Sequence, residues 1–197
     1  MSAALPIEAQ AVLDFWFGMP ASAEFGRSRK AWFAKDDAFD QTIRERFGTL
    51  VEQTLRSEHD DWADDPRSAL ARIIVLDQFT RNAFRGTARA FAGDALALAA
   101  ASRMVGARDD ESLAPFMRTF VYLPFEHAEG LAMQDESVRL FRRLVGDGDD
   151  PAKLVDFALR HRAIIERFGR FPHRNDLLGR QSTAEEIAFL AQPGSGF

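Results

Sequence analysis

Apolar side chains recur every three or four residues along most of this chain, and no stretch alternates apolar and polar residues between hairpin turns. The first spacing lines one face of an α-helix, whereas the second is what a half-buried strand requires. A β-sheet therefore has no evident source in this sequence. We predict an all-α fold of seven or eight helices, stacked in antiparallel pairs without a strict sequence repeat, in a single domain over residues 1–197.

Capping residues and prolines predict where the first helices begin. Asp36 or Asp37 can cap a helix that runs to about Leu55. Asp65 followed by Pro66 combines an N-cap with a proline at the first helical position, so the next helix is predicted to start there.

Glycine and proline predict where two later helices end. The alanine-rich segment 88–105 is expected to form one helix that closes on Gly106, a residue suited to a left-handed C-terminal position. A helix over residues 113–123 is expected to end at Pro124, because proline lacks the N–H group that an interior position donates.

Two further helices are predicted near the C-terminus. The dipeptide Asp150-Pro151 can start a long helix, and Gly169 can close it. Thr183, with Glu186 three residues later, predicts a capping box at the start of a short last helix.

Charge and composition exclude several classes of protein. The 30 acidic and 25 basic residues give a net charge of −5, which disfavours the basic field that nucleic-acid binding requires. There is no cysteine, so disulfides and thiolate metal sites are excluded. No basic start precedes an apolar stretch, and no apolar run is long enough to span a membrane. We expect a cytoplasmic protein without a nucleic-acid or membrane partner.

Three polar stretches at predicted helix ends, residues 76–87, 122–129 and 167–175, combine Arg, His and Asn with aromatic and turn-forming residues. Six arginines stand against two acidic residues between positions 160 and 180, a local excess of +4 on an acidic chain. Arginine presents a planar fork of donors that matches carboxylate and phosphate groups. The predicted ligand-binding residues are Arg81, Asn82, Arg85, Arg170, Arg174 and Asn175.

Together with residues 12–18 and 178–183, these stretches resemble bacterial proteins of the domain-of-unknown-function family 924. The resemblance extends from Leu13 to Phe197. It implies an all-helical, tetratricopeptide-like fold, and it brings no accepted reaction, substrate or cofactor. Where the family usually reads Phe-Pro-Arg-Asn, this chain has Thr80 in place of the proline, while the arginine and the asparagine remain.

Histidines in these stretches are the candidate catalytic groups. If chemistry occurs, His127 or His173 is the expected acid or base, and Glu126 is the expected residue that orients it. No histidine or carboxylate here has the spacing of a metal-binding motif, so we expect no tightly bound metal and predict no cofactor. Sequence motifs for a nucleophilic serine and for a phosphate loop are also absent.

Two functions are compatible with these residues. The first is a protein, or an enzyme of unknown reaction, that binds a small anionic metabolite in an Arg/His/Asn pocket. The second is a tetratricopeptide-like scaffold for a protein or peptide partner, in which the polar stretches are structural and the arginines pair with nearby acids. Independently of either function, we predict that Arg81, His127, Arg170 and His173 lie in one neighbourhood, as one polar cluster at three helix ends.

Overall fold

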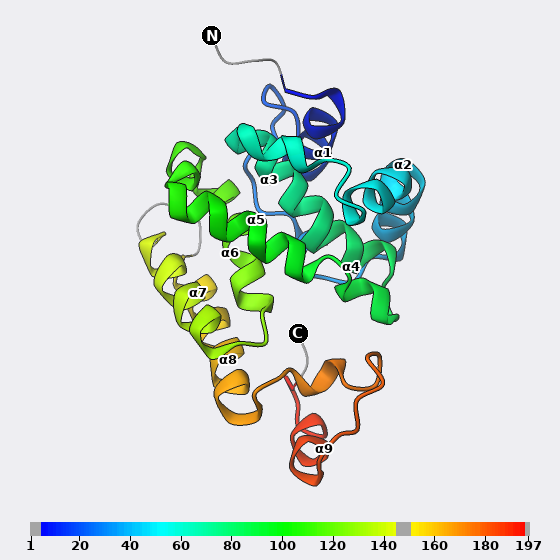
Figure 1. Ribbon diagram of the computed structural model, residues 1–197, viewed down its shortest axis with the longest axis vertical. Helices are drawn as coiled ribbons and strands as arrows, with labels where there is room; N and C mark the ends of the chain where they lie inside the picture. The colour runs from blue at the N-terminus through cyan, green and yellow to red at the C-terminus, as the bar shows by residue number, and fades with distance from the viewer. Residues whose placement is uncertain (1–4, 145–150, 196–197) are drawn as a thin grey trace.

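The computed structural model describes residues 5–144 and 151–195, and these ranges contain helices and turns but no strand (Figure 1). The prediction of an all-α fold is therefore confirmed. The α-helices are α1 (Ile7–Phe17), α2 (Asp37–Leu55), α3 (Pro66–Ile74), α4 (Thr80–Ala83), α5 (Asp94–Ala107), α6 (Pro115–His127), α7 (Leu131–Arg143), α8 (Pro151–Phe168) and α9 (Ala184–Leu190). Shorter turns are the 3-10 turns η1 (Lys30–Trp32), η2 (Asp60–Asp64), η4 (Ala88–Phe91), η5 (Asp109–Ser112) and η6 (Pro172–Arg174), and the π-helical turn η3 (Val75–Phe79).

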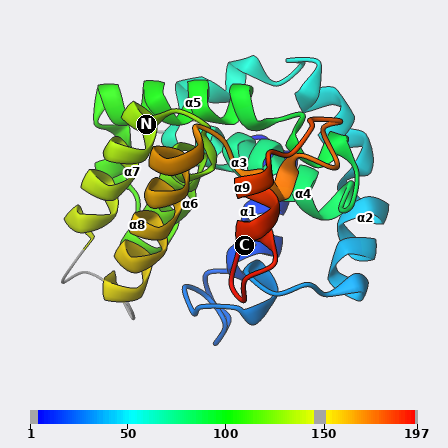
Figure 2. The same ribbon diagram turned by 90° about the horizontal axis from the view of Figure 1, so that it is seen from below.

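From α5 to α8, helices that follow one another in the chain pack side by side. The sequence α5, α6, α7 and α8 forms one run of neighbours, and α3 lies at the centre, in contact with α1, α5 and α6. Figure 2 shows α6, α7 and α8 standing together on one side, with α2 and α4 on the other. Among the described helices none has the length and hydrophobicity needed to cross a bilayer.

Aromatic side chains fill the centre of the main core. The Trp16 ring of α1 lies 5.8 Å from Phe39 of α2, 5.7 Å from Phe79 of η3 and 5.5 Å from Phe120 of α6, measured between ring centroids. Phenylalanine fills volume without a polar tip that needs a partner, which explains why a chain with 18 Phe has 1 Tyr. The single tyrosine, Tyr122, is buried and donates its hydroxyl to Asp110.

The predicted helix starts on either side of this core are confirmed. Asp36 accepts hydrogen bonds from the backbone N–H groups of Ala38 and Phe39, and Asp65 caps α3 in the same way. Each cap satisfies donors that have no partner inside the helix.

The predicted features near the C-terminus are also confirmed where they are described. Thr183 and Glu186 form both hydrogen bonds of a capping box. Gly169 follows α8 with a φ of +69°, a conformation that L side chains rarely adopt. Asp150, the predicted cap of α8, lies outside the described residues.

The prediction that Pro124 ends a helix is wrong, because α6 continues through it to His127. An interior proline costs about 3 kcal/mol. Its neighbours Leu123 and Phe125 are both buried, and fully burying one such side chain contributes roughly 1.5–3 kcal/mol. Packing on both sides of Pro124 therefore outweighs the lost hydrogen bond, and the helix delivers His127 at its last position.

The prediction of one helix over residues 88–105 that closes on Gly106 is also wrong. The segment is divided into η4 and α5, and α5 passes Gly106 and ends before Arg108, which takes the left-handed position with a φ of +63°. The division follows from a close approach at Gly93. A Cβ atom there would lie 2.1 Å from the carbonyl oxygen of Leu76, so a side chain cannot be accommodated. This contact holds the start of α5 against η3.

Residues after α8 pack around a small apolar cluster of their own. Ile164 and Ile165 of α8 and Phe171 form it, with Phe168 and Phe189 packed against them, and it is separate from the main core. In Figure 1 this C-terminal part, orange to red, lies below the other helices.

Candidate functional site

The first polar stretch lies on a local distortion of its helix. Between α3 and α4 the chain makes the π-helical turn η3, which places Asp77 and Phe79 in full burial. A π turn inserts an extra residue into a helix, and such turns are frequent at functional sites. Sequence periodicity alone does not reveal such a turn, because every residue of η3 is buried.

The three stretches meet at one place in the fold. Asp77 and Arg81 come from η3 and α4, His127 from the end of α6, and Arg174 from η6, and they gather beside Asp94 at the start of α5. These five residues are called the Asp77 cluster below. The helix ends that the sequence marked as polar therefore do converge.

Asp77 and His127 form a tight pair. The Nδ1 atom of His127 lies 2.7 Å from Oδ1 of Asp77, and Gln78 donates to the other carboxylate oxygen at 2.6 Å. Because Asp77 can only accept when ionised, this geometry assigns the imidazole proton to Nδ1. The other ring nitrogen of His127, Nε2, makes no hydrogen bond within the described residues, and the side chain is 16% exposed.

Charges within the cluster set the protonation of this pair. Burial by itself raises the pKa of Asp77, but the attraction of His127 and Arg81 is stronger and holds that pKa well below its ordinary value. Burial, followed by the positive charge of Arg81, lowers the pKa of His127, against the opposing effect of Asp77. Near pH 7 the pair is therefore a carboxylate and a neutral imidazole, with the Nε2 lone pair free to accept a proton.

Two guanidinium groups share the carboxylate of Asp94. Arg81 binds it through both Nη atoms, at 2.6 and 3.2 Å, and Arg174 binds one of its oxygens at 3.1 Å. Arg81 also lies 3.5 Å from Asp77. The carboxylate of Asp94 therefore brings together guanidinium groups from α4 and η6, and Arg81 connects them to Asp77.

Arg174 is the least satisfied member of the cluster. Its side chain is 7% exposed, and its guanidinium carbon lies 4.8 Å from the ring centroid of Phe91 and 4.6 Å from that of Phe171. Within the described residues its only hydrogen bond goes to Asp94, and its buried Nε has no partner. Burial, followed by repulsion from Arg81, lowers the pKa of Arg174 to about 10, so it remains charged at neutral pH.

Three further titratable groups surround the cluster, and all are neutral near pH 7. Burial, with the charge of Asp77, raises the pKa of Glu126 to about 8. Burial lowers the pKa of His161 to about 3. Burial, with the charge of Arg174, lowers the pKa of His173 to about 4.

The residue that orients His127 differs from the one expected. Asp77 occupies that position, whereas Glu126 lies beside His161, 3.4 Å from its Nδ1. Consecutive residues of a helix point about 100° apart, so Glu126 and His127 face different neighbours.

Four of the predicted ligand-binding residues are not part of the cluster; three of them bind acids, and Asn82 binds one of those three. Arg85 donates to both carboxylate oxygens of Asp40 on α2, at 2.5 and 2.9 Å, and also to the side-chain oxygen of Asn82, at 2.8 Å. Arg170 and Asn175 both donate to Glu186 of α9. Only Arg81 and Arg174 of the predicted six are members of the Asp77 cluster. His173 follows Phe171 with ring centroids 5.6 Å apart.

Asp94 was missed by the sequence reasoning. It lies in the first turn of an alanine-rich helix, where an acidic residue is already explained by its favourable interaction with the helix dipole. The preceding Gly93, which allows the close approach to Leu76, is the signal that could have drawn attention to this position.

The described residues contain no group of three His, Cys, Asp or Glu side chains arranged to hold a metal ion.

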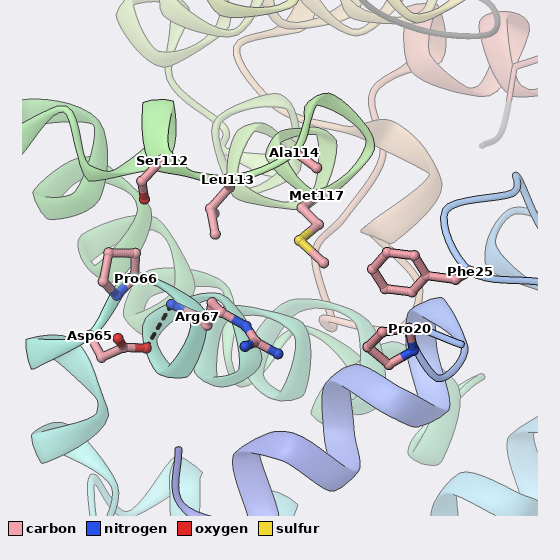
Figure 3. A pocket seen from close by; sticks show the side chains of 9 residues that line it. All are labelled: Pro20, Phe25, Asp65, Pro66, Arg67, Ser112, Leu113, Ala114 and Met117. Atoms are coloured by element: carbon pink, nitrogen blue, oxygen red, sulfur yellow. Dashed lines mark hydrogen bonds between the residues drawn. The ribbon is translucent and has the colours of Figure 1, made fainter. Parts of the chain in front are cut away.

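A depression of about 500 Å³ lies away from the Asp77 cluster, between the first turns of α3 and α6 (Figure 3). Its lining is mostly apolar, and Arg67 extends across its floor in Figure 3. Asp65 in its wall is occupied as the cap of α3. It lies at the opposite end of α6 from His127, and none of its lining residues belongs to the Asp77 cluster.

The chain is thus an all-α protein with a buried cluster of acid, imidazole and guanidinium groups at its helix ends. Residues 12–194 match the family described as bacterial protein of unknown function (DUF924), and the chain belongs to this family. It is similar to the solved structure of a protein of unknown function, ATU0120 from Agrobacterium tumefaciens. That chain is 39% identical, with a TM-score of 0.81, and the match covers 93% of this chain and 96% of the other. Among curated proteins, none matches.

Proposed function

We propose that the Asp77 cluster binds a small anionic metabolite and that His127 acts there as a general base. The observation that carries the proposal is Arg174, a buried guanidinium with one hydrogen-bond partner among the described residues. Buried polar groups are nearly always satisfied, so unused donors at a charged group call for a partner. A phosphate or carboxylate supplies acceptors with the geometry that a guanidinium binds best.

The position of His127 supports a chemical role beyond binding. Its Nδ1–H is directed to the buried carboxylate of Asp77, which fixes the ring and leaves Nε2 as a base. Arg81 and Arg174 lie on the same side of the fold and can hold an anion beside it. Phe91 and Phe171 flank Arg174 and exclude water, which strengthens each charge-assisted hydrogen bond.

The alternative function, a tetratricopeptide-like scaffold, finds less support. Such a scaffold needs apolar side chains on one continuous surface. The large exposed apolar residues come instead from several distant elements, among them Ile7 of α1, Phe33, Leu131 of α7 and Ile187 of α9. We also propose a cytoplasmic location, as expected for a chain without cysteine.

The proposal is tested by a thermal-shift screen against inorganic phosphate and a panel of phosphorylated and carboxylated metabolites. A ligand should raise Tm in a concentration-dependent way, as mass action requires. Arg174→Gln should weaken the affinity for any such ligand by about tenfold or more, because charge-assisted hydrogen bonds contribute about 1.5–3 kcal/mol. Isothermal titration gives the affinities.

Arg85→Gln is the matched control. It removes an arginine from the same polar stretches, but one that is paired with Asp40. It should leave ligand affinity unchanged. The proposal is wrong if no anion in the panel stabilises the protein, or if both variants lose affinity equally.

A further inference from the structure

Side-chain hydrogen bonds connect the residues around Arg174 to the C-terminal helix α9. Glu186 of α9 binds Arg170 through both carboxylate oxygens, at 2.7 and 2.8 Å, and also accepts from the side chain of Asn175 and the backbone of Thr183. Arg180 donates to Asn175 at 2.9 Å. Residues 170–190, called the flap below, are thus joined to one another by a network around one buried carboxylate.

Next to its start the flap is joined to α8 by the ion pair of Arg167 with Glu185, and farther along it is held through two carboxylates of other elements. Glu129, between α6 and α7, accepts the backbone N–H of Phe171 at 2.8 Å and two hydrogen bonds from Arg180, at 2.6 and 3.0 Å. Asp94 accepts from Arg174. The Glu129–Arg180 pair is partly exposed on both sides, so water can replace it at low cost, whereas the guanidinium of Arg174 is buried.

The flap begins next to a glycine that can serve as a hinge. Gly169 ends α8 with a φ of +69°, and no atom lies within 4 Å of the position that a Cβ would take. Apolar packing of the flap involves the small cluster at the end of α8, next to this hinge, and not the main core. Rotation at Gly169 therefore leaves the main core intact.

The flap also covers the candidate site. Arg174 enters the Asp77 cluster from the flap, and Phe171 packs on His161 with ring centroids 5.6 Å apart. Asp77 is 1% exposed and His127 16% exposed with the flap in place. The low exposure of both side chains restricts access to the cluster while the flap is in place.

We propose that residues 170–190 form a hinged flap over the Asp77 cluster, that Glu129 is the latch that holds it closed, and that closure positions Arg174 on the bound anion. Glu129 is thus a positioning residue for Arg174. The role of the flap in ligand access rests on the proposed function. The movement of the flap does not rest on the proposed function, because this movement can be measured on the full chain without any ligand.

The test is hydrogen exchange on Glu129→Gln, followed by NMR or mass spectrometry at the Cε1–H of each histidine and at backbone amides. Removing the charge of the latch should speed exchange at His127 by about tenfold, because it weakens hydrogen bonds to a charged group. His59, near Trp62 and far from the flap in sequence and contacts, should be unchanged. The Arg180 amide, bonded inside the flap to Asn175, should stay protected because the flap moves as a unit.

Glu136→Gln is the matched control, since it removes an ion pair with Arg139 on α7 and should change none of these rates. Three results would overturn the proposal. One is an unchanged rate at His127, which means that the flap does not cover the site. Another is loss of protection at Arg180 together with His127, which means that the segment melts. The last is faster exchange throughout α3 and α6, which means that Glu129 serves overall stability.

Discussion

At the scale of single residues, burial decides which groups of the site are charged. Asp77 and Arg81 remain ionised because they lie close enough to compensate each other, whereas Glu126 and His161 are forced toward their neutral forms. A neutral carboxylic acid beside a neutral imidazole avoids the cost of two buried charges. The site therefore contains charged groups that compensate one another and, beside them, groups that are neutral near pH 7.

Glu126 makes this arrangement measurable as a dependence of stability on pH. Burial, with the charge of Asp77, raises its pKa from the ordinary value of 4.5 to about 8. The folded state then holds a proton that the unfolded state releases, so the stability that Glu126 contributes is present below pH 4.5 and is lost as the pH rises to 8. The depressed pKa values of His161 and His173 act in the opposite direction and only below their ordinary value of 6.5.

We therefore expect the free energy of unfolding to fall by about 1–2 kcal/mol between pH 6.5 and pH 8, since one proton changes stability by up to about 1.4 kcal/mol per pH unit. Glu126→Gln keeps the shape and cannot ionise, so it should remove this fall. Urea unfolding at the two pH values measures it. An equal fall in both proteins would assign the titration to another group.

At the scale of elements, two glycines of the same helical region have opposite roles. Gly93 lies where α5 meets the carbonyl of Leu76, and Gly106 lies in the last turns of α5 with no atom near its Cβ position. The sequence reasoning gave Gly106 a structural role and gave Gly93 none. Both glycines occur in an alanine-rich segment, and only the contact of Gly93 with Leu76 of η3 distinguishes them.

Alanine substitution should separate the two glycines. Gly93→Ala should destabilise the protein by more than about 3 kcal/mol, since the added methyl group meets backbone that cannot move without displacing η3. Gly106→Ala should stabilise it by about 0.5–1 kcal/mol, the ordinary gain within a helix. Chemical denaturation of the two variants gives both values. Equal effects of the two substitutions would contradict the close approach of Gly93 to the carbonyl oxygen of Leu76.

How far prediction succeeded also depends on the element. Helix starts marked by Asp36, Asp65 and Thr183 could be predicted, because a cap is a local interaction between residues near in sequence. The continuation of α6 through Pro124 could not, because it depends on core contacts from other helices. The candidate site shows the same division. Its stretches were identified, but which arginines enter the cluster depends on where distant acids lie.

At the scale of the whole molecule, the apolar side chains form a large core and a small separate cluster. Phe120 belongs to the first, among the aromatic rings around Trp16, and Phe189 packs on the second. Local regions with few buried contacts open at a lower free energy than the whole protein. The two parts should therefore respond differently to the same truncation.

Phe120→Ala should lower the free energy of global unfolding by about 3–5 kcal/mol, as expected for a buried phenylalanine. Phe189→Ala should leave the midpoint of the main urea transition almost unchanged while it speeds amide exchange within α9. Circular dichroism and hydrogen exchange on the two variants make the comparison. A shared, equal loss of global stability would mean that the C-terminal cluster is an integral part of the main core.

The π-helical turn η3 also sets the angular phase of the helix that contains it. One inserted residue rotates every following side chain by about 100° relative to those before it. Asp77 lies within this turn, and Arg81 lies just after it. Deleting one residue from 75–79 would restore a regular helix but turn Arg81 to another face, away from Asp94. The number of residues in this one turn thus determines whether Arg81 faces Asp94, even when both residues are kept.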